Sequence, residues 1–172
     1  PPLPKKKSRG GSHDSRRARV DVKLDGGKSM FIKRPYLAYG PAKTVKLVER
    51  AVTQYKGRHA KSPKVLIGNL SKRGGGKLEP HLSHRHGVDI DVGYVMQGES
   101  LSTTRFEGIN QNTLDARRTW DLVKSFLDTG EVRYIFMDYA LQKTLYEHAK
   151  STGMSEGELD ELFQGFNVNN NC

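Results

Sequence analysis

The sequence lacks several features that would assign it to a common structural class. It contains a single cysteine, Cys172, so no disulfide can form within the chain. It has no run of 18 apolar residues, which excludes a membrane-spanning helix, and no signal peptide is visible. A hydrophobic content of 35% in 172 residues is enough for one globular domain, which should bury on the order of 70% of its unfolded surface.

Acidic residues are nearly absent from residues 1–19. This segment has seven Lys or Arg residues and one acidic residue, Asp14, so it holds more than half of the net charge of +10. Low hydrophobicity combined with like charge cannot offset the entropy of ordering, and we expect a disordered basic tail. The tail would attract a carboxylate-rich cell-wall polymer, nucleic acid or anionic lipid alike, or serve only as a solubilising linker. A specific nucleic-acid-binding module is not favoured, because the charge is not spread over a groove with interleaved aromatic residues.

Beyond the tail, apolar periodicity predicts strands that alternate with helices. Residues 19–24 and 29–32 flank a turn at residues 25–27, which indicates a hairpin. Further strands are expected at residues 64–70, 88–94 and 132–137, and helices at residues 42–57, 114–127, 139–151 and 155–163. Thr113 is the expected cap of the helix at 114–127, and Ser155 with Glu158 forms a capping-box pair. The pattern predicts an α+β fold with a small mixed or antiparallel sheet.

One stretch, residues 80–92, concentrates the side chains that bind metals. Three histidines, His81, His84 and His86, fall within six residues, and the carboxylates Asp89 and Asp91 follow them. Histidine nitrogen and aspartate oxygen are both zinc ligands, and a catalytic zinc usually has three protein ligands and a water. The spacing therefore predicts a divalent-metal site with two of its three ligands visible.

The local pattern explains how these ligands could meet. From Val88 onward apolar and polar residues alternate, which puts Asp89 and Asp91 on one face of a strand. Gly87 allows the backbone to turn, so that His84 in the preceding loop can face Asp91. By contrast, His148 stands alone on a predicted helix and is expected to be a solvated residue.

The glycine-rich run at residues 71–77 could be mistaken for a phosphate-binding loop. It lacks the Gly-x-x-x-x-Gly-Lys-Ser/Thr spacing, and Pro80 follows where the phosphate-binding helix should begin. We interpret it as a flexible loop beside the metal, forming one wall of a substrate cleft.

The run Ser83 to Asp91 resembles the Ser-His-x-x-Gly-x-x-x-Asp motif of the zinc peptidase superfamily that includes lysostaphin and D-Ala-D-Ala carboxypeptidases. The wider chain, from about Arg34 to Gln164, resembles one branch, the penicillin-insensitive murein endopeptidases. The blocks that carry this likeness are residues 68–71, 74–76, 80–81, 92–94, 113–120, 134–136 and 141–149.

The resemblance implies a small central, mainly antiparallel sheet with flanking helices and a zinc site on the sheet. It also implies that His84 and Asp91 bind Zn²⁺, and His81 aligns with a histidine near a further metal. The implied activity is hydrolysis of the D-alanyl–diaminopimelyl cross-links of peptidoglycan in the periplasm. Peptidoglycan cross-links are therefore the expected partner, without a specific nucleic acid or a transmembrane segment.

The chain departs from this family at one point. Similar endopeptidases carry a His-x-His pair on a later strand, whereas no His-x-His follows Asp91 here. The catalytic and substrate-binding residues therefore stay unassigned. We expect an incomplete catalytic domain at residues 20–164 and a divergent end at 165–172. A catalytically inactive truncated remnant that binds cell wall or metal is the alternative.

Overall fold

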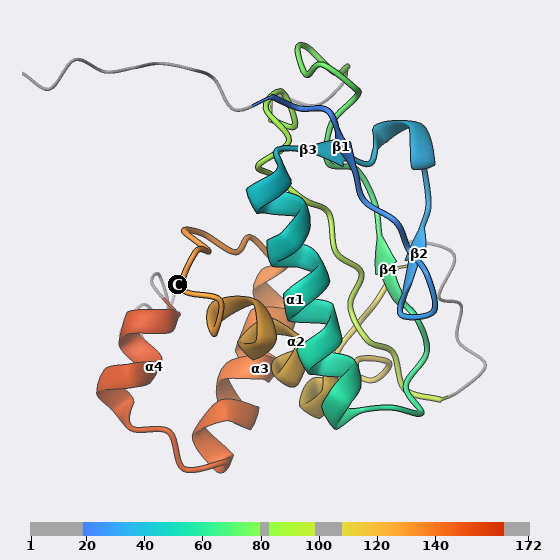
Figure 1. Cartoon of the computed structure of the whole chain (residues 1–172). Coiled ribbons are helices and arrows are strands. Elements are labelled where there is room, and N and C mark those ends of the chain that lie inside the picture. Colours follow the sequence, from blue (N-terminus) through green and yellow to red (C-terminus); the bar gives the residue numbers. More distant parts are fainter. Residues whose placement is uncertain (1–18, 80–82, 99–107, 164–172) are drawn as a thin grey trace, which may run out of the picture.

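The computed structural model describes residues 19–79, 83–98 and 108–163 (Figure 1). The α+β class predicted from the sequence is confirmed. In chain order the elements are β1 (Val22–Lys23), β2 (Met30–Ile32), the 3-10 helix η1 (Pro35–Leu37), β3 (Tyr39–Gly40), α1 (Ala42–Arg58), β4 (Val65–Ile67), α2 (Ala116–Leu127), α3 (Tyr139–Ser151) and α4 (Glu156–Leu162). The predicted disordered tail up to residue 18 and the end at 165–172 lie outside the described residues.

The described strands form two separate pairs. β1 pairs with β3 in antiparallel fashion, and β2 pairs with β4 in parallel fashion. The prediction of a hairpin between residues 19–24 and 29–32 is therefore wrong. The chain does turn there, with the Met30 amide donating to the Gly26 carbonyl at 2.9 Å. Beyond the turn the strands diverge, because Leu24 and Met30 both enter the core and each strand finds its partner later in the chain.

A third extended segment, residues 91–93, lies against β4 and the residues after it. The Asp91 amide donates to the Asn69 carbonyl at 3.0 Å, and the Gly68 amide donates to the Asp91 carbonyl at 2.8 Å. An antiparallel bridge joins Val92 to Ile67. Residues 91–93 are the part of the strand expected at residues 88–94 that forms this antiparallel pairing. It fixes Asp91 relative to the segment that leaves β4.

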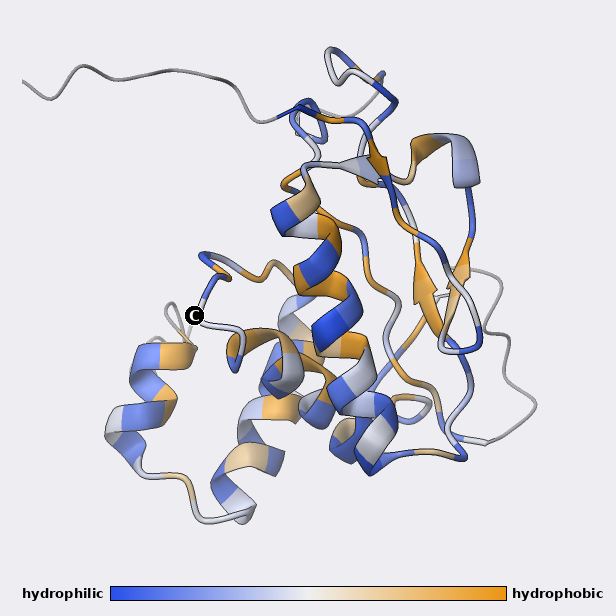
Figure 2. Cartoon of the chain, viewed as in Figure 1, coloured by the Kyte–Doolittle hydropathy of each residue, from blue (hydrophilic) through white to orange (hydrophobic). Residues whose placement is uncertain are grey.

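Two apolar clusters hold the described elements together. In the first, α1 packs its buried face against β2, β4 and α2, through Val45, Val48, Ala51, Val52 and Tyr55. In Figure 2, β2 and β4 are apolar, whereas α1 alternates apolar and polar bands, as expected of a helix with one buried face. The second cluster joins α2, α3 and α4, and it includes Trp120 stacked on Phe163 with ring centroids 5.6 Å apart. α2 contributes to both clusters and so links the two halves of the core.

The strand predicted at residues 132–137 is not present. The segment runs between α2 and α3 without regular structure, and its aromatic side chains are exposed, Phe136 to 91% and Tyr134 to 63%. The two rings stack on each other, with centroids 6.1 Å apart. The alternating β-branched and aromatic residues suit a strand. The segment nevertheless forms no backbone ladder with any part of the chain that the structure describes.

The helix expected at 114–127 begins later than predicted, at Ala116, and its cap is Asp115 rather than Thr113. The Asp115 carboxylate accepts from the Arg118 amide at 2.8 Å and from the Arg118 Nε at 2.6 Å. Thr113 instead bonds to Asn110 in the preceding turn. The other predicted helices agree closely with α1, α3 and α4, including the Ser155–Glu158 capping box.

We expect Asp115→Ala to lower the free energy of unfolding by about 1–2 kcal/mol, because it leaves a helix amide without its cap. Thr113→Ala should cost less than half as much, since its bonds to Asn110 are exposed to solvent. Urea denaturation followed by circular dichroism measures both. A Thr113→Ala loss equal to or larger than the Asp115→Ala loss would contradict this assignment of the cap.

Candidate metal-binding site

The loop that carries the candidate ligands is held against the fold by close backbone contacts. Gly87 adopts φ +62°, and a Cβ placed on it would lie 2.6 Å from the Gly40 Cα and 2.8 Å from the Tyr39 carbonyl oxygen. On the other side, the Gly76 amide donates to the Arg85 carbonyl at 2.8 Å. The loop is therefore clamped between the end of β3 and the glycine-rich run.

His84 is buried in this loop, and polar contacts on three sides fix its position. The residue is only 4% exposed, and its backbone adopts φ +59°. The ring Nδ1 lies 2.9 Å from the Leu70 carbonyl oxygen, and Nε2 lies 3.1 Å from Asp91 Oδ1. The His84 backbone amide donates to Asp89 Oδ2 at 3.2 Å. As the sequence predicted, the turn brings His84 to Asp91, and Asp89 and Asp91 both reach the same residue.

Asp91 is held from the other side. Its Oδ2 accepts from the Asn69 amide at 3.2 Å, while Oδ1 faces the His84 ring. The Asp91 side chain is 39% exposed, in contrast to the 5% of His84. The pair therefore has one buried member and one member that reaches solvent.

This geometry fits two ligands of one zinc ion. A carbonyl oxygen can only accept a hydrogen bond, so the contact with Leu70 places the hydrogen on Nδ1 and leaves Nε2 facing Asp91. Metal-binding histidines are commonly oriented in this way by a backbone carbonyl. Tetrahedral zinc with bonds of 2.0–2.1 Å keeps its ligand atoms about 3.3 Å apart. The observed 3.1 Å between Nε2 and Oδ1 is close to that value.

The other histidines of the cluster do not join this pair within the described residues. His81 lies outside them, and His86 is exposed. Across residues 19–79, 83–98 and 108–163, no group of three or more His, Cys, Asp or Glu side chains is placed to hold a metal ion. His148 lies on α3, away from the loop, and is partly exposed.

Sequence reasoning missed the segment that positions both candidate ligands. Leu70 orients the His84 ring through its carbonyl, and Asn69 holds Asp91 through its amide. Both contacts use backbone atoms, which no residue type reveals. Ser71 follows directly, with a fully buried hydroxyl that has no hydrogen-bond partner among the described residues.

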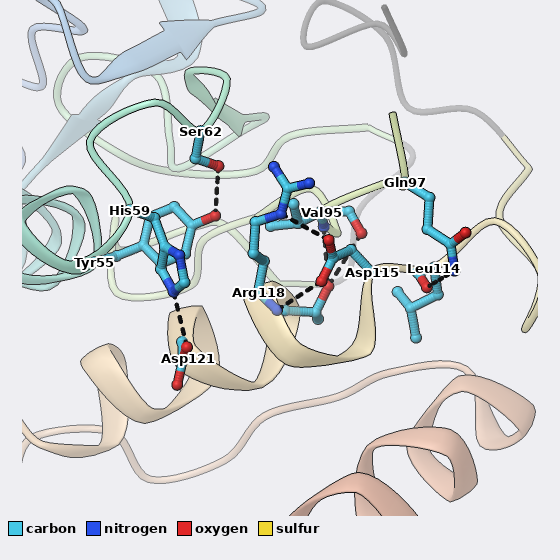
Figure 3. A network of polar contacts seen from close by, with 10 residues as sticks. Tyr55, His59, Ser62, Val95, Gln97, Leu114, Asp115, Arg118 and Asp121 are labelled. Atoms are coloured by element: carbon cyan, nitrogen blue, oxygen red, sulfur yellow. Dashed lines mark hydrogen bonds and ion pairs between the residues drawn. The ribbon is translucent and has the colours of Figure 1, made fainter. Parts of the chain in front are cut away.

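A second polar network lies between the end of α1 and α2 (Figure 3). His59 Nε2 lies 2.8 Å from Asp121 Oδ2, and the Tyr55 hydroxyl lies 2.7 Å from the Ser62 hydroxyl. Burial raises the pKa of the Tyr55 hydroxyl above its usual 10.0, with the Ser62 hydrogen bond acting in the opposite direction. Because these polar groups hydrogen-bond to one another, we interpret the network as a structural link between α1 and α2.

Comparison with protein families decides the ancestry of the chain. The model of the penicillin-insensitive murein endopeptidase family matches residues 25–153, which include the glycine-rich run, His84 and Asp91. The chain belongs to this family. Among curated proteins no match was found.

Membership in the murein endopeptidase family implies a peptidase that acts on peptidoglycan. The matched range runs from the turn after β1 to two residues beyond the end of α3. It therefore contains both apolar clusters in large part and the whole of the candidate site. None of the helices that the structure describes has the length and apolar character needed to cross a membrane.

Proposed function

We propose that this murein endopeptidase homologue is a zinc metallopeptidase of the periplasm that hydrolyses the D-alanyl–diaminopimelyl cross-links of peptidoglycan. His84 and Asp91 would bind the zinc, with His81 as a further candidate ligand. The observation that carries the proposal is the His84–Asp91 contact of 3.1 Å, with the Leu70 carbonyl on the opposite ring nitrogen.

When bound, zinc would lower the pKa of its water towards ~7 and polarise the scissile carbonyl. Backbone groups of this chain orient His84 and Asp91 for that chemistry. The Leu70 carbonyl keeps a proton on His84 Nδ1, so that Nε2 is the ligand atom. The Asn69 amide holds one oxygen of Asp91 and leaves the other facing His84. Because Asp91 is partly exposed, a substrate can approach from its side.

The activity is tested with purified cross-linked dimeric muropeptides, added zinc and chromatography of the products. We expect release of monomers that a chelator abolishes and that His84→Ala reduces by at least about 100-fold, since loss of an outer-shell partner alone costs 10–100-fold. His148→Ala is the matched control and should cleave like the wild type.

Absence of monomer release would contradict the proposed function, and so would two other results. Cleavage that persists in the presence of a chelator would exclude the metal, and release of free D-alanine without monomer formation would indicate a different bond.

A further inference from the structure

Basic side chains gather on the two loops that frame His84. Lys72, Arg73 and Lys77 belong to the run at residues 71–77, and Arg85 follows His84 directly. All four residues are exposed. Figure 1 shows both loops at the end of the molecule where β1 and β3 pair. The two loops that carry these cations therefore lie beside the candidate metal-binding site.

The backbone fixes the two loops to each other. The Gly76 amide donates to the Arg85 carbonyl at 2.8 Å, and a Cβ on Gly75 would lie 2.6 Å from the same oxygen. The Leu70 carbonyl, just before the glycine-rich run, accepts from the His84 ring. These contacts fix the backbone near Lys72 and Arg85 relative to His84.

Three of the four cations have no carboxylate partner among the described residues. Lys77 pairs with Glu79 in the same loop. Lys72, Arg73 and Arg85 form no ion pair with any residue that the structure describes. The acidic groups close to them along the chain are also engaged, Glu79 by Lys77, and Asp89 and Asp91 by His84. Lys72, Arg73 and Arg85 therefore form a positive rim beside the candidate site that no carboxylate of the described residues neutralises.

We infer that Lys72, Arg73 and Arg85 form a carboxylate-binding rim that recognises the free carboxylate next to the scissile bond. The inference rests on the proposed function. In a D-alanyl–diaminopimelyl link, the carbon attached to the scissile nitrogen also bears a carboxylate. A guanidinium or ammonium group binds such a carboxylate through charge-assisted hydrogen bonds. This rim would select cross-links with a free carboxylate at that position over cross-links amidated there.

The rim is tested by binding, with the full chain and two synthetic cross-link peptides that differ only at this carboxylate, one free and one as the carboxamide. Fluorescence anisotropy with a chelator present gives both dissociation constants without cleavage. We expect the wild type to bind the free acid about 10-fold more tightly, which corresponds to about 1.4 kcal/mol for one charged hydrogen-bonding partner. Lys72→Gln/Arg85→Gln should reduce this preference to less than 2-fold.

The matched control removes two cations elsewhere. Lys143→Gln/Lys150→Gln on α3 changes the net charge equally and should retain the 10-fold preference. A wild type without a preference, or a Lys72→Gln/Arg85→Gln variant that keeps it, would overturn the rim. If the preference is present but monomers are not released from muropeptides, the proposed function fails and the rim stands. If monomers are released but no preference is found, only the rim fails.

Discussion

Gly87→Ala is expected to lower the free energy of unfolding by about 3 kcal/mol or more. The residue adopts φ +62°, in the left-handed region that costs about 1–3 kcal/mol for a residue with a side chain. The new methyl group would also lie 2.6 Å from the Gly40 Cα and 2.8 Å from the Tyr39 carbonyl oxygen, both backbone atoms that cannot rotate away. Such overpacking typically costs another 1–3 kcal/mol. For a domain of this size, a loss of 3 kcal/mol lowers Tm by about 6–12 °C.

Gly74→Ala separates the cost of the backbone conformation from the cost of the steric overlap. Gly74 adopts φ +82° in the neighbouring loop, but a Cβ there has no heavy atom within 4 Å. The substitution should therefore cost only the conformational term, about 1–2 kcal/mol. Thermal unfolding followed by circular dichroism compares the variants. Equal melting temperatures for Gly87→Ala and Gly74→Ala would show that the loop does not pack closely against β3.

Local patterns in the sequence predicted the helices well. α3 has the predicted bounds, α1 differs from its prediction by one residue at its end, and the capping box opens α4 as expected. Helices are determined largely by periodicity and capping within a few residues, which a sequence displays directly. The cap of α2 was misassigned because Thr113 and Asp115 are both good caps by residue type.

Strand pairing could not be predicted in the same way, because partners lie far apart in the sequence. The turn at residues 25–27 was recognised, but β1 pairs with β3 and β2 with β4. A hairpin and two diverging strands have the same local pattern, and only the core decides between them. For residues 132–137 the residue types favour a strand, yet a strand also requires a partner ladder.

The sequence predicted which side chains of the candidate site meet, but it did not predict the backbone groups that orient them. The spacing of His84, Gly87 and Asp91 was sufficient to predict that the His84 and Asp91 side chains meet. It could not show that the Leu70 carbonyl and the Asn69 amide orient them, since every residue carries these groups. It also could not show that Gly40 gives the loop room to approach β3.

Zinc binding by the His84–Asp91 pair is the central claim, and equilibrium dialysis tests it most directly. His84→Ala and Asp91→Ala each remove one ligand and leave the other without its cation, so both should weaken zinc binding by about 10–100-fold or more. His148→Ala removes a histidine of α3 that does not contact the site and serves as the matched control. We predict one zinc bound per chain in the wild type and in His148→Ala, and a marked loss in the other two variants. Equal zinc retention in all three variants would contradict the account.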